Sequence, residues 1–157
     1  MSLVTTDHLH DLRRHGYAVL PDLVAPERVE ILAKAAADHF PKWEDVVAGR
    51  DRTGVNDHGL AFRLFPYDAD ELNLLPFDER FVDLAEQAFD GQPVFLTQSL
   101  VRASYPLPSS SDQDLHRDYT NNGLLAPSDD PRYGQLAVLV YLTDVDLGTA
   151  PTYICSR

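Results

Sequence analysis

Residues 92–106 read QPVFLTQSLVRASYP, and this stretch decides which class of fold the chain adopts. It is rich in β-branched, aromatic and other apolar residues, a composition typical of a strand. Before Gly91 the apolar residues are spaced as in helices, and after the stretch a second apolar run, QLAVLVYLTDV, occupies residues 135–145. A chain that begins with helices and continues with strands predicts an α+β fold with a mainly antiparallel sheet.

Upstream of Gly91, the spacing of apolar residues predicts three helices with recognisable ends. The first has Thr5 or Thr6 as its cap and Gly16 after its last turn, and the third is capped by Asp78. The predicted helices are residues 5–16, 25–40 and 78–91, residues 42–58 are a loop with room for one helical turn, and the predicted strands are residues 17–21, 60–67, 92–106, 135–145 and 150–157.

Composition bounds the class of protein. The chain of 157 residues, 44% of them hydrophobic, has the size and composition of one globular domain. A net charge of −12 argues against a nucleic-acid partner, because the field of the protein repels polyanions. The sequence has no apolar run of membrane-spanning length, no leader-like N-terminus and a single cysteine, Cys155. We therefore expect a cytoplasmic protein with neither a nucleic-acid nor a membrane partner.

His116 and Asp118 stand one residue apart, between a proline- and serine-rich loop and the apolar run at 135–145. Residues two apart on an extended segment project to the same face, so this imidazole and this carboxylate can bind one metal ion together. They make up two thirds of the two-histidine, one-carboxylate set that holds ferrous iron in oxygenases. The residues alone leave an alternative, a surface histidine beside an aspartate that caps a turn, because a bare His-x-Asp pair is a weak signal.

Four stretches carry a resemblance to a known family. They read HGYAVLPDLVAPERVEILAKAA (15–36), PVFLTQSLVRASYP (93–106), QDLHRDY (113–119) and LAVLVYLTDVDLGTAPTYICSR (136–157). Because these four stretches follow one another in this order, the chain resembles the phytanoyl-CoA dioxygenase family of iron- and 2-oxoglutarate-dependent oxygenases. The third stretch looks like the metal motif of the family, and the fourth looks like the two strands that follow it.

The resemblance implies a double-stranded β-helix, or jelly roll, with helices flanking its N-terminal side. It makes His116 and Asp118 the first two ligands of Fe(II), and it makes 2-oxoglutarate the co-substrate in the hydroxylation of a small organic molecule. Gln98 stands where family members often place a polar contact to 2-oxoglutarate, and Tyr105 and Thr152 are candidates of the same kind. For these three residues the alternative is strand packing or an ordinary surface position.

The family places its third iron ligand, a histidine, and an arginine for 2-oxoglutarate several strands after the metal motif. No histidine follows His116 in the 157 residues, and His58 is the nearest stand-in. A jelly roll also needs about eight strands, more than are predicted here. We therefore expect residues 1–157 to be one domain, the N-terminal part of such an oxygenase, with an incomplete jelly roll and no activity by itself. Open sheet edges favour a homodimer, and the alternative is a non-catalytic jelly-roll-like binding or assembly module that has lost the metal site.

Overall fold

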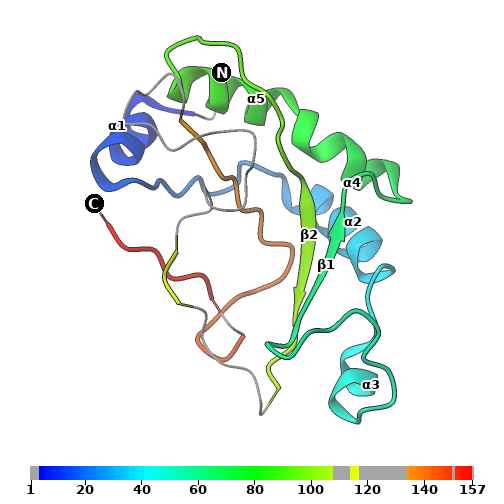
Figure 1. Ribbon diagram of the computed structural model, residues 1–157. Coiled ribbons are helices and arrows are strands. Elements are labelled where there is room, and N and C mark those ends of the chain that lie inside the picture. Colours follow the sequence, from blue (N-terminus) through cyan, green and yellow to red (C-terminus); the bar gives the residue numbers. More distant parts are fainter. Residues whose placement is uncertain (1–3, 108–113, 117–133, 150, 157) are drawn as a thin grey trace.

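The computed structural model describes residues 4–107, 114–116, 134–149 and 151–156, and this part of the chain combines helices with one small antiparallel sheet (Figure 1). The elements in chain order are α1 (Thr6–His15), α2 (Pro26–Ala37), α3 (Trp43–Val47), β1 (Leu60–Leu64), α4 (Asp70–Leu74), the 3-10 turn η1 (Leu75–Phe77), α5 (Glu79–Ala88) and β2 (Leu100–Ser104). The mixed class expected from the sequence is confirmed. The described residues contain no jelly roll.

The helix ends follow the capping residues of the sequence. Thr5 caps α1 through its side chain, and Gly16 ends the helix with a positive φ of 84° while its N–H donates to the carbonyl of Leu12 at 3.0 Å. Asp78 caps α5, where its carboxylate accepts from the backbone N–H of Arg80 at 3.1 Å. These three ends lie where the sequence predicts them.

The sheet pairs β1 with β2 in antiparallel register, with Phe62 opposite Arg102 and Leu64 opposite Leu100. The predicted strand at 92–106 is therefore correct only in its C-terminal half, since β1 offers a partner only to residues 100–104. One face of the sheet is buried, and Ala61 on that face has no exposed surface. The other face is open, and 61% of the Leu64 surface is exposed there.

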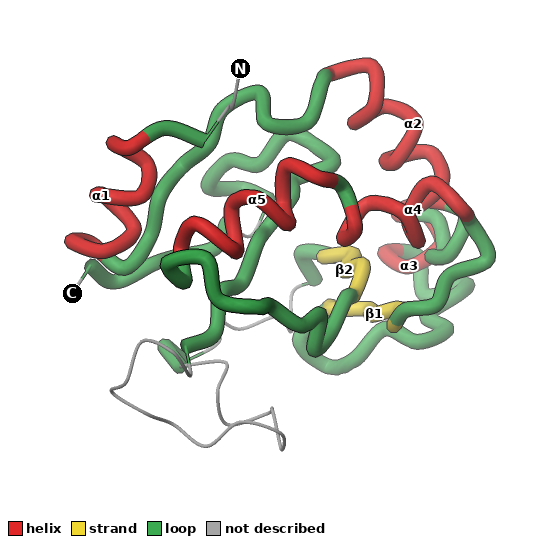
Figure 2. The backbone as a smooth tube through the Cα atoms, turned by 90° about the horizontal axis from the view of Figure 1, so that it is seen from above, coloured by secondary structure: helices red, strands yellow, loops and turns green. Residues whose placement is uncertain are grey.

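Two apolar clusters hold the sheet against the helices. The first joins α2 to α4, with Leu32 and Leu72 at its centre, and Val101 of β2 packs against it. The second joins α3 to the sheet and centres on Val46 and Ala61. Figure 2 shows α2, α3 and α4 near the sheet and α1 on the far side of the molecule, close to the C-terminal end.

Three predicted strands are wrong where the structure describes them. Residues 17–20 belong to no helix or strand, and the chain then turns at residues 21 and 22, where Asp22 has a φ of 57°. Residues 134–149 and 151–156 have no strand either. A strand exists only with a partner that completes its hydrogen-bond ladder, and an apolar sequence does not supply that partner.

Within the described ranges, no helix combines the length and the apolar character that crossing a bilayer requires.

Candidate functional site

His116 is the member of the predicted metal pair that the structure describes, whereas Asp118 lies outside the described residues. The side chain of His116 is exposed, and its Nδ1 lies 2.8 Å from the carbonyl oxygen of Asp114. A carbonyl oxygen only accepts hydrogen bonds, so Nδ1 carries the proton in this pair and the neutral ring has its lone pair on Nε2. Histidines that bind metals are commonly oriented by a hydrogen bond of this kind from their other ring nitrogen.

This arrangement fits one ligand of a metal centre. A neutral imidazole with a defined tautomer suits Fe(II), and a carboxylate two residues away would be the second ligand. In the described ranges, no group of three or more His, Cys, Asp and Glu side chains lies close enough together to hold a metal ion. The described part of the chain therefore presents the first predicted ligand, and the joint geometry with Asp118 stays a prediction.

The three predicted co-substrate residues occupy different surroundings. Gln98 is exposed in the segment that leads into β2, and Thr152 is exposed in the segment 151–156. Neither side chain makes a hydrogen bond to another described residue. Both are accessible to a ligand from solvent, and their role toward 2-oxoglutarate stays a prediction.

Tyr105, by contrast, is buried directly after β2. Its hydroxyl donates to the carbonyl oxygen of Pro41 at 2.7 Å, and its ring stacks on Trp43 with 6.3 Å between centroids and 2° between planes. Its backbone N–H donates to the carbonyl of Gly59 at 2.7 Å. Burial raises the pKa of the Tyr105 phenol. These contacts account for the residue as a link between the sheet and α3, and a contact to 2-oxoglutarate stays a prediction.

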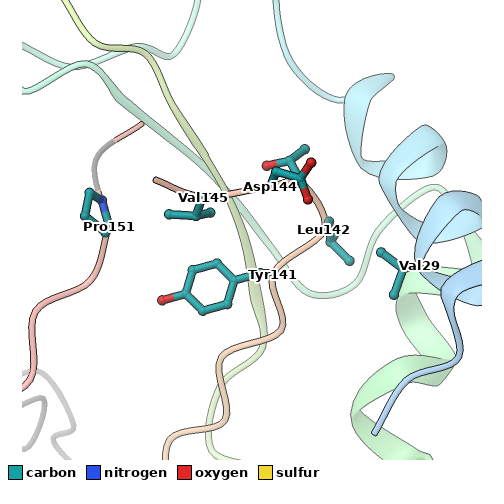
Figure 3. A pocket seen from close by; sticks show the side chains of 7 residues that line it. Val29, Tyr141, Leu142, Asp144, Val145 and Pro151 are labelled. Atoms are coloured by element: carbon teal, nitrogen blue, oxygen red, sulfur yellow. The ribbon is translucent and has the colours of Figure 1, made fainter. Parts of the chain in front are cut away.

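An open hollow of about 530 Å³ lies between α2 and the C-terminal segments (Figure 3). Figure 3 shows Val29 of α2 on one side of it and Pro151 on the other. Its lining residues are Val29, Tyr141, Leu142, Thr143, Asp144, Val145 and Pro151. The sequence predicts a strand over residues 135–145, yet Tyr141 lies in no strand and half of its surface is exposed. The sequence signal nearest to the hollow is the leucine-threonine-aspartate at 142–144, which lies within the fourth stretch of the resemblance.

A second hollow, of about 500 Å³, lies where α5 begins. It is lined by Arg28, Leu74, Phe77, Asp78, Glu79 and Arg80. Asp78 forms ion pairs at 2.7 Å with both Arg28 and Arg80, and Arg80 also donates to the carbonyl of Leu23. Hydrogen bonds from Arg80 are the main cause that lowers the pKa of Asp78 to about 2, against the opposing effect of burial. The ion pair between Arg28 and Asp78 fastens α2 to α5. Asp78 and Glu79 together balance the charge of the two arginines, so the lining offers no net charge to a ligand.

Comparison with known proteins gives one match. A family model described as phytanoyl-CoA dioxygenase (PhyH) matches residues 12–154, a range that includes His116, Asp118 and all three co-substrate candidates. No curated protein and no solved structure matches the chain.

Proposed function

The chain belongs to the phytanoyl-CoA dioxygenase (PhyH) family, and from this premise we propose that it functions as a non-haem Fe(II), 2-oxoglutarate-dependent dioxygenase that hydroxylates a small organic molecule. The observation that carries the proposal is the family match across residues 12–154. The tautomer of His116, which presents Nε2 as the coordinating nitrogen, supports it.

In this proposal His116 and Asp118 hold Fe(II). The metal, together with 2-oxoglutarate, supplies the oxidising chemistry for a substrate C–H bond. The carbonyl of Asp114 keeps the His116 ring in the tautomer and orientation that coordination needs, because it accepts the Nδ1 proton. Gln98 and Thr152 contact the co-substrate from the solvent-accessible side.

We place the two-stranded sheet of β1 and β2 inside a jelly-roll scaffold. Its open face carries Phe62, Leu64 and Leu100, which are 40%, 61% and 42% exposed. Such a face is suited to excluding water from a reaction centre, as oxidative chemistry on an organic substrate requires. The net charge of −12 favours a substrate that is neutral or cationic over a polyanion.

Metal binding by single-residue variants tests this function. Titration of the chain with Fe(II) under anaerobic conditions, followed by calorimetry, would compare the wild type with His116→Ala and Asp118→Ala. We expect each substitution to weaken binding by about tenfold or more, since each removes one of two protein ligands. Because residues 1–157 are expected to have no activity by themselves, the binding of Fe(II) is the readout, and succinate formation is not.

His10→Ala is the matched control, because His10 is an exposed histidine of α1, upstream of the motif, with no predicted role toward the metal. It should bind Fe(II) as the wild type does. If His116→Ala binds Fe(II) as tightly as the wild type, the assignment of the metal ligands is wrong. A wild-type chain that binds no Fe(II) would favour the non-catalytic binding module instead.

A further inference from the structure

Helix α1 begins with a capping box in which histidine takes the position that glutamate or glutamine usually fills. The backbone N–H of His8 donates to Oγ1 of Thr5 at 3.3 Å. In return, the backbone N–H of Thr5 donates to Nδ1 of His8 at 3.2 Å. Two N–H groups at the start of the helix are therefore satisfied by one reciprocal pair.

This cap requires a neutral imidazole. Nδ1 accepts the N–H of Thr5 only while it keeps its lone pair, and a protonated imidazole is a donor at both nitrogens. Protonation would also add a positive charge at the N-terminal end of a helix, where the helix dipole disfavours it. Proton binding by His8 and the second hydrogen bond of the capping box consequently exclude each other.

Helix α1 depends on its cap more than α2 and α5 do, because it is less buried. It has ten residues, none of which is buried, whereas α2 and α5 each bury two. Isolated helices of this length are marginal in water. The ion pair that ties α1 to the rest of the chain, Arg13 to Asp90, is exposed on both sides, and such pairs stabilise little.

We propose that α1 is a pH-sensitive element, ordered from its first turn when His8 is neutral and frayed at that turn when His8 binds a proton. Because the folded helix selects the neutral ring, its first turn is ordered at the higher pH and loses order as the pH falls. The other titratable and charged groups on α1 and on α5, the helix that packs against it, are Asp7, His10, Asp11, Arg13, Arg14, His15, Glu79, Arg80, Asp83 and Glu86. Carboxylates are the largest class among them and attract the protonated ring, so they work against the cap as the pH falls.

The test follows individual backbone amides of the full chain by NMR. Hydrogen exchange of Thr5, His8 and Leu9 would be measured at about pH 8 and about pH 5, the range in which histidine titrates, and corrected for the intrinsic effect of pH on exchange. We expect the protection of these amides to fall about threefold to tenfold at the lower pH, as loss of a cap implies. The amides of α5 serve as the internal reference.

Two glutamine variants separate His8 from the other histidines of the helix. His8→Gln keeps an acceptor at both pH values, so its first-turn protection should not change with pH. His10→Gln, which alters an exposed histidine on the same helix, should respond as the wild type does. Unchanged protection in the wild type, or a wild-type response in His8→Gln, would overturn the proposal.

Discussion

Asp78 combines a helix cap with two ion pairs in one side chain that is 9% exposed. It accepts from the backbone of α5 and binds Arg28 of α2, so it fixes the start of one helix against another. Its partner Arg80 comes from the same turn of α5 and also reaches the carbonyl of Leu23. The ionised carboxylate of Asp78 has these partners only in the folded chain, so its charge stabilises the folded state.

Acid should therefore weaken the fold through Asp78. The pKa of this carboxyl is lowered to about 2, chiefly by the hydrogen bonds from Arg80. A lowered folded-state pKa contributes stability above the ordinary aspartate value of about 3.9, and this contribution is lost as the pH falls from there toward about 2. Asp78→Asn keeps a capping residue but removes the charge, and we expect it to reduce the free energy of unfolding at neutral pH by about 1–3 kcal/mol.

Urea unfolding at a series of pH values measures both effects. The Asp78→Asn variant should lose less stability than the wild type between about pH 4 and about pH 2, because the titrating group is gone. Asp83→Asn, which alters an exposed aspartate on the same helix, is the control and should behave as the wild type at every pH. Equal acid sensitivity of Asp78→Asn and the wild type would contradict the role given to this carboxylate.

The roles of single residues were predictable from the sequence where those residues bind backbone groups close to them in the chain. Thr5, Gly16 and Asp78 act on backbone groups within a few positions, so their types and spacing sufficed. Tyr105 was not predictable in this way, because its hydroxyl binds Pro41, 64 positions away in the sequence. For His116 the sequence predicts a ligand type, and the tautomer came only from the position of the Asp114 carbonyl.

At the scale of elements, the three predicted helices were confirmed, whereas of the five predicted strands only those at 60–67 and 92–106 contain an observed strand. A helix completes its hydrogen bonds within its own segment, so the pattern in residues 25–40 was enough to predict α2. A strand needs a partner elsewhere in the chain. The run at 135–145 has a strand composition, yet its residues pair in no sheet of the described part. The short helix α4 was missed because five residues carry too little periodicity to detect.

The packing of α2 on α4 should be the main support of the first apolar cluster. Leu32 and Leu72 are 0% and 2% exposed, so truncation of either leaves a cavity. We expect Leu32→Ala and Leu72→Ala each to reduce the free energy of unfolding by about 2–5 kcal/mol, as is typical for buried leucines. The double variant should lose less than the sum, because both side chains belong to one cluster.

Ile31→Ala is the matched control for that experiment. Ile31 neighbours Leu32 on α2 but is 53% exposed, so its truncation should cost well under about 1 kcal/mol. Urea unfolding followed by circular dichroism would rank the three single variants. A cost for Ile31→Ala equal to that of Leu32→Ala would show that α2 does not pack on α4 through this face.

At the scale of the whole molecule, the family was predictable because its motifs are spread over most of the chain. The four stretches at 15–36, 93–106, 113–119 and 136–157 together led to the same family that matches residues 12–154. The shape of the site was not predictable, because the hollow beside Tyr141 depends on how α2 meets residues 141–145.

The open face of the sheet and the net charge act in opposite directions on self-association. In the described part, β1 pairs with β2 and makes one further bridge, from Ala61 to Val55, whereas the outer edge of β2 is covered by no described strand. Open edges and exposed apolar side chains favour a homodimer, whereas a charge of −12 on each copy opposes it.

We propose a homodimer whose dissociation constant falls as salt screens this repulsion, by about tenfold between about 0.05 M and about 0.5 M salt. Sedimentation equilibrium at both salt concentrations measures it. Leu64→Lys, on the open face, should weaken the dimer, whereas Val47→Lys, at an exposed position of α3, should not. A monomer at all salt and protein concentrations would show that neither the edges nor this face is used between copies.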